Sequence, residues 1–149
     1  MATPKPGSFV HIEIASADPH RTRKFLEEVF AWKFEEIPEM NYTMYDAGSG
    51  PGGGIMSPME GQGPGILNYI MSTDIDRDIA KIQAAGGTVF VPKMEIPGMG
   101  WWAGFREPTG LVLALYESKP APRPRPRARA RPKSSARKGK KGGRGRRSR

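Results

Sequence analysis

The chain contains no cysteine among its 149 residues and only two histidines, His11 and His20. Without cysteine, neither a disulfide framework nor a thiolate nucleophile or metal ligand can form. No apolar run approaches the roughly 20 residues that a membrane helix needs. The first eight residues also lack the apolar segment of a secretion signal. We therefore expect a soluble cytoplasmic protein with no membrane partner.

Acidic residues are absent from the C-terminal end. From Lys119 onward the chain has 15 Lys and Arg residues and no Asp or Glu, whereas residues 1–118 carry the other nine bases and all 15 acids, a net charge of −6. Segment 119–149 also has too few apolar residues to form a core, so it is predicted to be a disordered Arg/Lys/Pro-rich tail. An acidic body with a basic tail is typical of an arm that binds polyanions.

The tail predicts non-specific binding to DNA or RNA, because Lys and Arg release counterions from phosphate backbones. Association with the nucleoid would follow from such binding. No aromatic residue lies in the tail, so base stacking is not expected. The alternative is a solubilising tail with incidental polyanion affinity. The side chains expected to contact phosphate are Arg123, Arg125, Arg127, Arg129, Arg131, Arg137, Lys138, Lys140, Lys141, Arg144, Arg146 and Arg147.

The body shows one order of elements twice. Alternating residues predict a strand at 9–15, and Asp18 followed by Pro19 predicts the start of a helix that ends near Phe30. Strands are then predicted at 32–36, 42–47 and 53–57. After a Gly/Pro-rich connector at 58–65, the pattern returns as a strand at 66–72, a helix capped by Thr73 or Asp74 and ended by Gly86-Gly87, a strand at 88–91, a loop at 92–98 and a final hairpin.

The final hairpin spans Gly100 to Glu117 and is the most characteristic stretch of the body. Aromatic residues favour a strand before the turn Glu107-Pro108-Thr109-Gly110, and an apolar run favours a buried strand after it. Trp101 and Trp102 are adjacent, so they must point to opposite faces of this strand. We expect one of them to pack in the core and the other to lie at a cup mouth or subunit interface.

The motifs FVHIEI, ADPHRTRKFLEEVFAWKF and IPGMGWWAGFREPTG resemble the vicinal oxygen chelate (VOC) superfamily, which includes glyoxalase I, the bleomycin-resistance proteins and the extradiol dioxygenases. The resemblance covers residues 8–117. Ala31 and Glu107 depart from it, since Gly and Asp are usual there. It implies an α+β domain at 1–118 with βαβββ halves at about 8–60 and 66–117, which together form a cupped eight-stranded mixed sheet. It also implies a homodimer that covers the strand edges.

Metal-dependent members of the superfamily hold a divalent ion with one ligand on each of four strands. Carried over one at a time, these positions fall on His11, on Asn68, near Ile55 or Met56, and on Ala114. Only His11 is a strong donor for a transition metal, and three or four donors are needed. The resemblance therefore predicts no complete metal site and no cofactor, with a divalent ion at His11 as the minor alternative.

A polar cluster inside an apolar cup is predicted instead. Sliding the first half onto the second without gaps pairs His11 with Asn68, so strand parity puts His11, Glu13 and Asn68 on one face. His11 could donate a hydrogen bond or act as general base. Glu13 could orient it, or act as base if burial raises its pKa. The remaining predicted ligand-binding residues are Tyr45, Met56, Trp101 and Trp102.

Three functions remain open at this stage. The first is a glyoxalase-like protein that binds a small organic ligand and acts as a lyase or isomerase through His11 and Glu13, or has an activity related to the dioxygenases. The second is a non-catalytic binding protein of the bleomycin-resistance type. The third is a nucleic-acid-associated protein that acts through its tail. A fold by itself does not choose among these reactions.

Overall fold

The computed structural model describes residues 4–61 and 63–120 of the chain. The tail contacts proposed above, at 121–149, lie outside these described residues. The elements follow in the order β1 (Phe9–Ala15), α1 (Pro19–Phe30), β2 (Lys33–Ile37), a 3₁₀ turn (Pro38–Met40), β3 (Tyr42–Asp46), β4 (Gly53–Met56), β5 (Gly65–Met71), α2 (Ile75–Ala84), β6 (Thr88–Ile96), β7 (Gly100–Arg106) and β8 (Val112–Ser118). No helix in the described part of the chain is long and apolar enough to cross a membrane.

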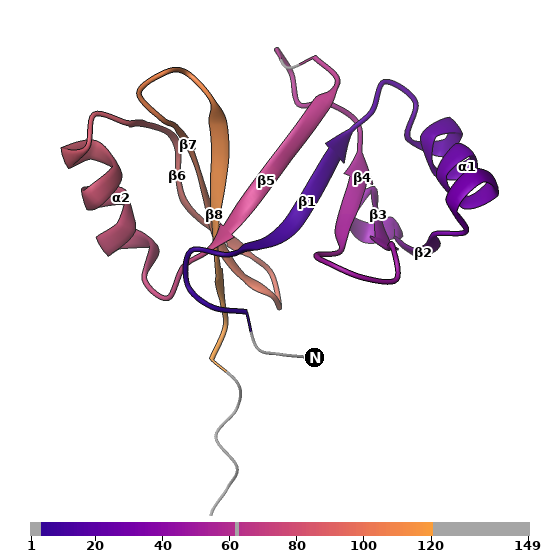
Figure 1. The fold of residues 1–149 in the computed structure, drawn as a ribbon, viewed down its shortest axis with the longest axis horizontal. Coiled ribbons are helices and arrows are strands. Elements are labelled where there is room, and N and C mark those ends of the chain that lie inside the picture. The colour runs from indigo at the N-terminus through magenta and orange to yellow at the C-terminus, as the bar shows by residue number, and fades with distance from the viewer. Residues whose placement is uncertain (1–3, 62, 121–149) are drawn as a thin grey trace, which may run out of the picture.

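The eight strands form one mixed sheet in the order β2-β3-β4-β1-β5-β8-β7-β6. Strand β1 lies antiparallel to β5 at the centre, while β1–β4 and β5–β8 are parallel. Each half therefore repeats the same path. The halves splay apart from the central pair, with α1 and α2 at opposite outer ends (Figure 1). The predicted fold class, two βαβββ modules in a cupped eight-stranded sheet, is confirmed.

The two helices begin with the same capping arrangement. In the first half, Ser16 Oγ accepts the N–H of Asp18, whose carboxylate accepts the N–H of Arg21, each at 3.0 Å. In the second half, Ser72, Asp74 and Arg77 repeat both bonds at 3.0 Å. These caps satisfy backbone donors that have no partner inside the helix. The repeat of Ser-x-Asp-x-x-Arg has an offset of 56 residues, not the 57 of the gapless alignment above.

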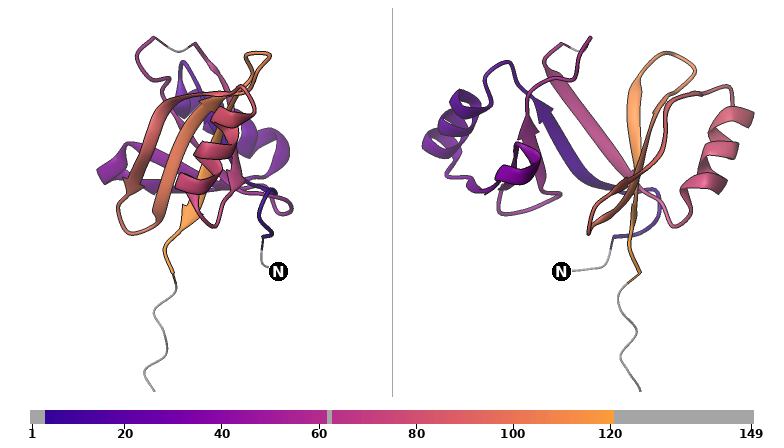
Figure 2. Two further views of the ribbon diagram at one scale, coloured as in Figure 1. Left: turned by 90° about the vertical axis from the view of Figure 1, so that its left-hand side faces the viewer. Right: turned by 180° about the vertical axis from the view of Figure 1, so that it is seen from behind.

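The two faces of the sheet have different roles in the second half. Ile75 of α2 packs with Ala103, Phe105 and Leu115 in the buried core cluster. The neighbouring residues on β7 and β8 point the other way, so the opposite face of the same strands is left to line a concave surface. Seen from behind and from the side, the helices stay outside the bowl of the sheet (Figure 2). The core therefore supports the sheet from its convex side.

The first half has the thinner core. Helix α1 contributes no buried side chain, and Phe25 and Phe30 on it are each 57% exposed. Its last residue is followed by Ala31, which has a left-handed φ of 56°. Left-handed backbone is unfavourable for a residue with a Cβ, and Gly is the common choice after a helix. The departure at Ala31 from the superfamily pattern therefore lies at a strained position.

Strand β6 differs from its prediction. It runs through Pro92 to Ile96, where a loop at 92–98 was expected. Pro92 lacks an N–H and is normally excluded from a sheet interior, but β6 is an edge strand and its pairing with β7 shifts register between Val91 and Met94. An edge and a bulge are the two places where a sheet accepts proline. The rule that proline interrupts a strand holds for central strands, and β6 escapes it because it lies at the edge of the sheet.

Candidate functional site

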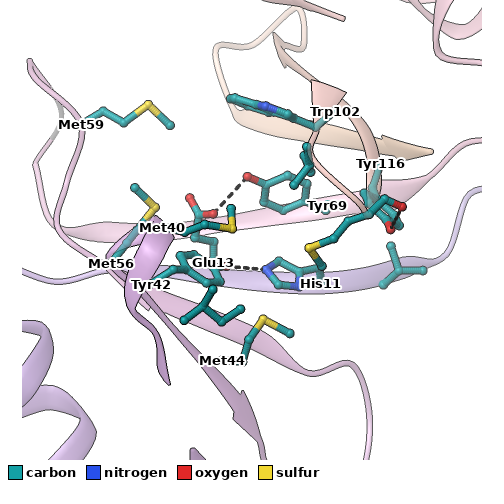
Figure 3. Close-up of a pocket in the computed structure, with 14 residues that line it drawn as sticks. His11, Glu13, Met40, Tyr42, Met44, Met56, Met59, Tyr69, Trp102 and Tyr116 are labelled. Atoms are coloured by element: carbon teal, nitrogen blue, oxygen red, sulfur yellow. Dashed lines mark hydrogen bonds between the residues drawn. The ribbon is translucent and has the colours of Figure 1, made fainter. Parts of the chain in front are cut away.

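The concave face of the sheet holds a cavity of about 430 Å³, called the cup below. Its size falls within the usual range for small-molecule pockets. Central strands β1 and β5 form its floor, and both halves contribute to its walls (Figure 3). The lining residues are mostly apolar, with five methionines among them: Val10, His11, Glu13, Ile37, Met40, Tyr42, Met44, Met56, Met59, Tyr69, Ile96, Met99, Trp102 and Tyr116.

Four polar side chains meet on the floor of the cup. Tyr69 Oη donates a hydrogen bond to Glu13 Oε2 at 3.1 Å. Beside them, a hydrogen bond of 2.7 Å joins His11 Nε2 to Tyr42 Oη. Figure 3 shows both pairs side by side, with methionine side chains around them. Glu13 is only 9% exposed, so its carboxyl group is a buried titratable group in an apolar surrounding.

The sheet register brings these groups together. His11 pairs with Tyr69 and Glu13 with Leu67 across β1 and β5, so Tyr69 lies on the same face as both polar residues of β1. Glu13 also pairs with Gly54 of β4. A Cβ at Gly54 would lie 1.9 Å from Tyr42 Cζ. Gly54 thus leaves the space in which the Tyr42 ring reaches His11.

A bulge adds one more lining residue. The register of β1 against β5 shifts between Phe9 and His11. As a result both Val10 and His11 line the cup, although simple alternation assigns Val10 to the other face. An extra residue that re-aims side chains in this way is the usual effect of a β-bulge.

Burial controls the protonation of the floor. It raises the pKa of Glu13 above the ordinary carboxyl value, while the nearby hydroxyl groups of Tyr69 and Tyr42 oppose that shift. Burial raises the pKa of Tyr42 and of Tyr69 as well, and the charge of Glu13 raises both further. Burial lowers the pKa of His11. Near neutral pH the floor therefore offers a neutral imidazole, two phenol donors and a carboxyl group that can exchange a proton.

Several of the residues predicted from sequence do lie at the cup. His11 and Glu13 are on its floor, and Met56 and Trp102 are in its walls. Trp101 and Trp102 point to opposite faces, as expected. Trp101 packs against the buried core cluster, and the ammonium of Lys93 lies 5.3 Å from its ring centre. The assignment of Trp101 to the ligand pocket was therefore wrong.

Two other predicted ligand contacts lie away from the cup. Asn68 pairs with Ile12, so it faces the opposite side of the sheet from His11, and the prediction of a His11–Glu13–Asn68 cluster was wrong. Tyr45 is also on that side. It stacks on Trp32 and donates a hydrogen bond to the Ile12 carbonyl at 2.9 Å. Asn68 was misplaced because an alignment error of one residue reverses the face of a strand.

Tyr42 and Tyr69 were not among the residues predicted to line the pocket. The signal for Tyr69 was present in the repeated helix caps, because an offset of 56 aligns Glu13 with Tyr69 and Ser16 with Ser72. Alternation puts Tyr42 and Tyr45 on opposite faces of their strand, but nothing in the sequence indicates which of these faces is concave. Only the pairing of β3 with β4 shows that.

The residues at the superfamily's metal positions do not fit a divalent ion. His11 and Glu13 are two donors on one strand, whereas Met56 of β4, Tyr69 of β5 and Ala114 of β8 add no His or carboxylate donor on the cup face. Within residues 4–61 and 63–120, no three His, Cys, Asp or Glu side chains come close enough to hold a metal. A transition metal needs three or four such donors around one ion. The side chains on the cup face therefore do not support a metal-dependent reaction step.

The fold is shared with solved structures of low sequence identity. A hypothetical protein of Bacillus halodurans C-125 superposes with a TM-score of 0.62 at 16% identity, covering 80% of this chain and all of that one. Methylmalonyl-CoA epimerase from Mycobacterium tuberculosis superposes with a TM-score of 0.61 at 17% identity, covering 80% and 93%. The epimerase of Streptomyces coelicolor, solved with 2-nitronate-propionyl-CoA, gives 0.57 at 17% identity over 76% and 99%. This is the glyoxalase-like fold.

Sequence comparison gives a nearer relationship. The proteins named "Putative glyoxylase CFP32" in Mycobacterium bovis and Mycobacterium tuberculosis are each 31% identical over 121 residues, which is 76% of this chain and 45% of theirs. The chain thus spans about half the length of these curated relatives. No protein-family model matches it. Together with the fold, these likenesses show that the chain belongs to the vicinal oxygen chelate superfamily.

Proposed function

We propose that this VOC domain binds a small, mainly apolar organic molecule in the cup, with Glu13 as the group that exchanges a proton with it and without a divalent metal. The observation that carries the proposal is a carboxyl group, 9% exposed, on the floor of an apolar cavity of about 430 Å³. Ligand sites commonly combine apolar walls with a few convergent polar groups. A buried carboxyl with a raised pKa also suits general acid–base work near neutrality.

The lining favours an adaptable fit to the bound molecule. Methionine side chains are flexible and polarisable, so five of them can repack around ligands of different shape. Three of them, Met40, Met59 and Met99, are 48%, 38% and 41% exposed even though they line the cup. These three can move with little change in core packing. The walls therefore favour binding of apolar molecules of different shapes over recognition of one ligand with a fixed shape.

Each of the four polar side chains on the floor would have its own part in proton exchange. Glu13 would take or return a proton on the bound molecule, as in a lyase or isomerase step. Tyr69 donates to Glu13 Oε2 and would stabilise its ionised form. His11 and Tyr42, joined at 2.7 Å, would orient each other beside it. In a binding protein of the bleomycin-resistance type, the same groups would hold the ligand without turnover.

Displacement of a neutral apolar dye, Nile red, tests the binding site. Met56→Trp should fill the cup from β4 and weaken dye binding at least about tenfold, which is the loss expected when an apolar group of this size is excluded. Leu111→Trp places the same new ring at an exposed position, 61% accessible, away from the cup and should bind like the parent. Equal dye affinity in a folded Met56→Trp variant would refute the cup as the site.

Turnover is tested separately by proton exchange. A panel of carbonyl compounds with an acidic C–H is incubated with the protein in heavy water, and deuterium incorporation is followed by mass spectrometry. Incorporation that depends on the protein and disappears in Glu13→Gln would support a lyase or isomerase step. Ligands that bind without any exchange would instead support the binding-only function.

A further inference from the structure

We infer that the molecule bound in the cup carries a positive charge, an ammonium or related organic cation attached to an apolar body, and that Glu13 is its counter-ion. This inference rests on the proposed function and specifies its ligand class. The lining has an unbalanced set of ionisable side chains. Among the described residues that line the cup, Glu13 is the one with a carboxyl group, and none is Lys or Arg.

One oxygen of Glu13 is open to the cup. Oε2 accepts the hydrogen bond of Tyr69 at 3.1 Å. Oε1 accepts none of the hydrogen bonds found among the described residues, and no fully buried side-chain oxygen or nitrogen there lacks a partner. Oε1 must therefore reach the open space of the cavity, where a donor on the ligand can approach it. An anionic ligand group at the same place would meet the carboxylate without any cation to offset the repulsion.

The walls add a second attraction for cations. Four aromatic side chains, Tyr42, Tyr69, Trp102 and Tyr116, line the cavity, and a cation near an aromatic face is attracted by the ring's quadrupole. The five methionine sulfurs are polarisable and tolerate a charged neighbour better than aliphatic groups do. Burial lowers the pKa of His11, so the imidazole beside Glu13 is neutral and does not oppose a cationic ligand.

The apolar lining strengthens the selection for a charged partner. Apolar walls remove water from the bound group, and this strengthens its pairing with Glu13. The chemistry selected is therefore a lipophilic amine or quaternary ammonium compound of a size that fits a cavity of about 430 Å³.

Three probes with one carbon skeleton test the charge: phenylbutylamine as the cation, phenylbutanol as the neutral compound and phenylbutanoate as the anion. Each displaces Nile red from the full chain at physiological salt. We expect the amine to bind tightest and the acid weakest. Glu13→Gln keeps the side-chain shape and removes the charge, so it should weaken amine binding about ten- to hundredfold, the range for a hydrogen bond to a charged partner. Alcohol binding should stay within about twofold.

Glu27→Gln is the matched control. It makes the same charge change at an exposed position on α1, at the outer end of the first half, and should leave all three affinities unchanged (Figure 1). Equal binding of amine and alcohol, or tighter binding of the acid, would overturn the inference while the cup remained a binding site. If none of the probes displaces the dye, the proposed function is refuted along with the inference. Circular dichroism and melting curves establish that each variant is folded.

Discussion

Gly54→Ala should disrupt the cup floor without replacing any of its polar residues. The added Cβ would lie 1.9 Å from Cζ, 2.0 Å from Oη and 2.1 Å from Cε1 of Tyr42. Such separations are far below carbon–carbon contact distance, so the Tyr42 ring must swing away. Its hydrogen bond of 2.7 Å to His11 is then lost.

The magnitude combines two effects. Forcing a group into a packed site typically costs about 1–3 kcal/mol, and losing one hydrogen bond adds about 1 kcal/mol. We therefore expect a loss of about 2–4 kcal/mol in the free energy of unfolding. For a domain of this size that corresponds to a fall in Tm of roughly 10 °C. The measurement is thermal and urea unfolding followed by circular dichroism, together with Nile red affinity, which should fall as the ring enters the cup.

Two comparisons assign the effect to Tyr42. Gly65→Ala is the control, because nothing lies within 4 Å of a Cβ at that position, and it should leave Tm and dye binding nearly unchanged. In a Tyr42→Ala background the obstacle is gone, so adding Gly54→Ala should cost less than about 1 kcal/mol and give a coupling energy of about 1–3 kcal/mol. An unchanged Tm in the single variant, or additive losses in the double variant, would refute the placement of Tyr42 across Gly54.

Four further predictions follow from other features of the chain. The pKa of Glu13 is raised in the folded state, so its stabilising contribution is complete below the ordinary carboxyl pKa and is lost as pH rises through the raised pKa. Glu13→Gln does not titrate, so its Tm should rise relative to that of the parent over this pH range. A Tm difference between the two proteins that stays constant with pH would contradict the raised pKa. Ala31→Gly relieves a left-handed φ of 56° and should raise the free energy of unfolding in urea by about 0.5–1 kcal/mol. An unchanged or lowered midpoint of urea unfolding would show that Ala31 is not strained. Truncation after Ser118 should leave Tm nearly unchanged and remove salt-dependent, sequence-independent DNA binding, since the body is net −6 and the tail holds 15 bases; retention of that binding with the same salt slope would place the site in the body. Sedimentation at tens of micromolar should detect a homodimer that covers the exposed edges β2 and β6, and a monomer at that concentration would rule the prediction out.

Local features were predictable from the sequence because local physics determines them. The strand at 9–15 and the helix from Pro19 to Phe30 were both predicted within a residue or so, since alternation, an Asp cap and a proline in the first turn act over a few neighbours. The turn after Arg106 was equally clear, and its Gly110 has the positive φ of 101° that such a turn requires. The repeated order of elements was enough to predict the cupped sheet.

The composition of the cup, in contrast, depended on tertiary structure. Alternation along a strand shows which residues share a face, but only pairing with neighbouring strands shows which face is concave, and a shift of one residue exchanges Asn68 for Tyr69. The bulge that adds Val10 to the cup and the edge position that admits Pro92 into β6 also belong to the assembled sheet. The sequence by itself determined the elements, their order and the presence of His11 and Glu13 on one strand. The register of eight strands decided that Tyr69 and Tyr42 meet them, because those contacts join residues 31 and 56 positions apart.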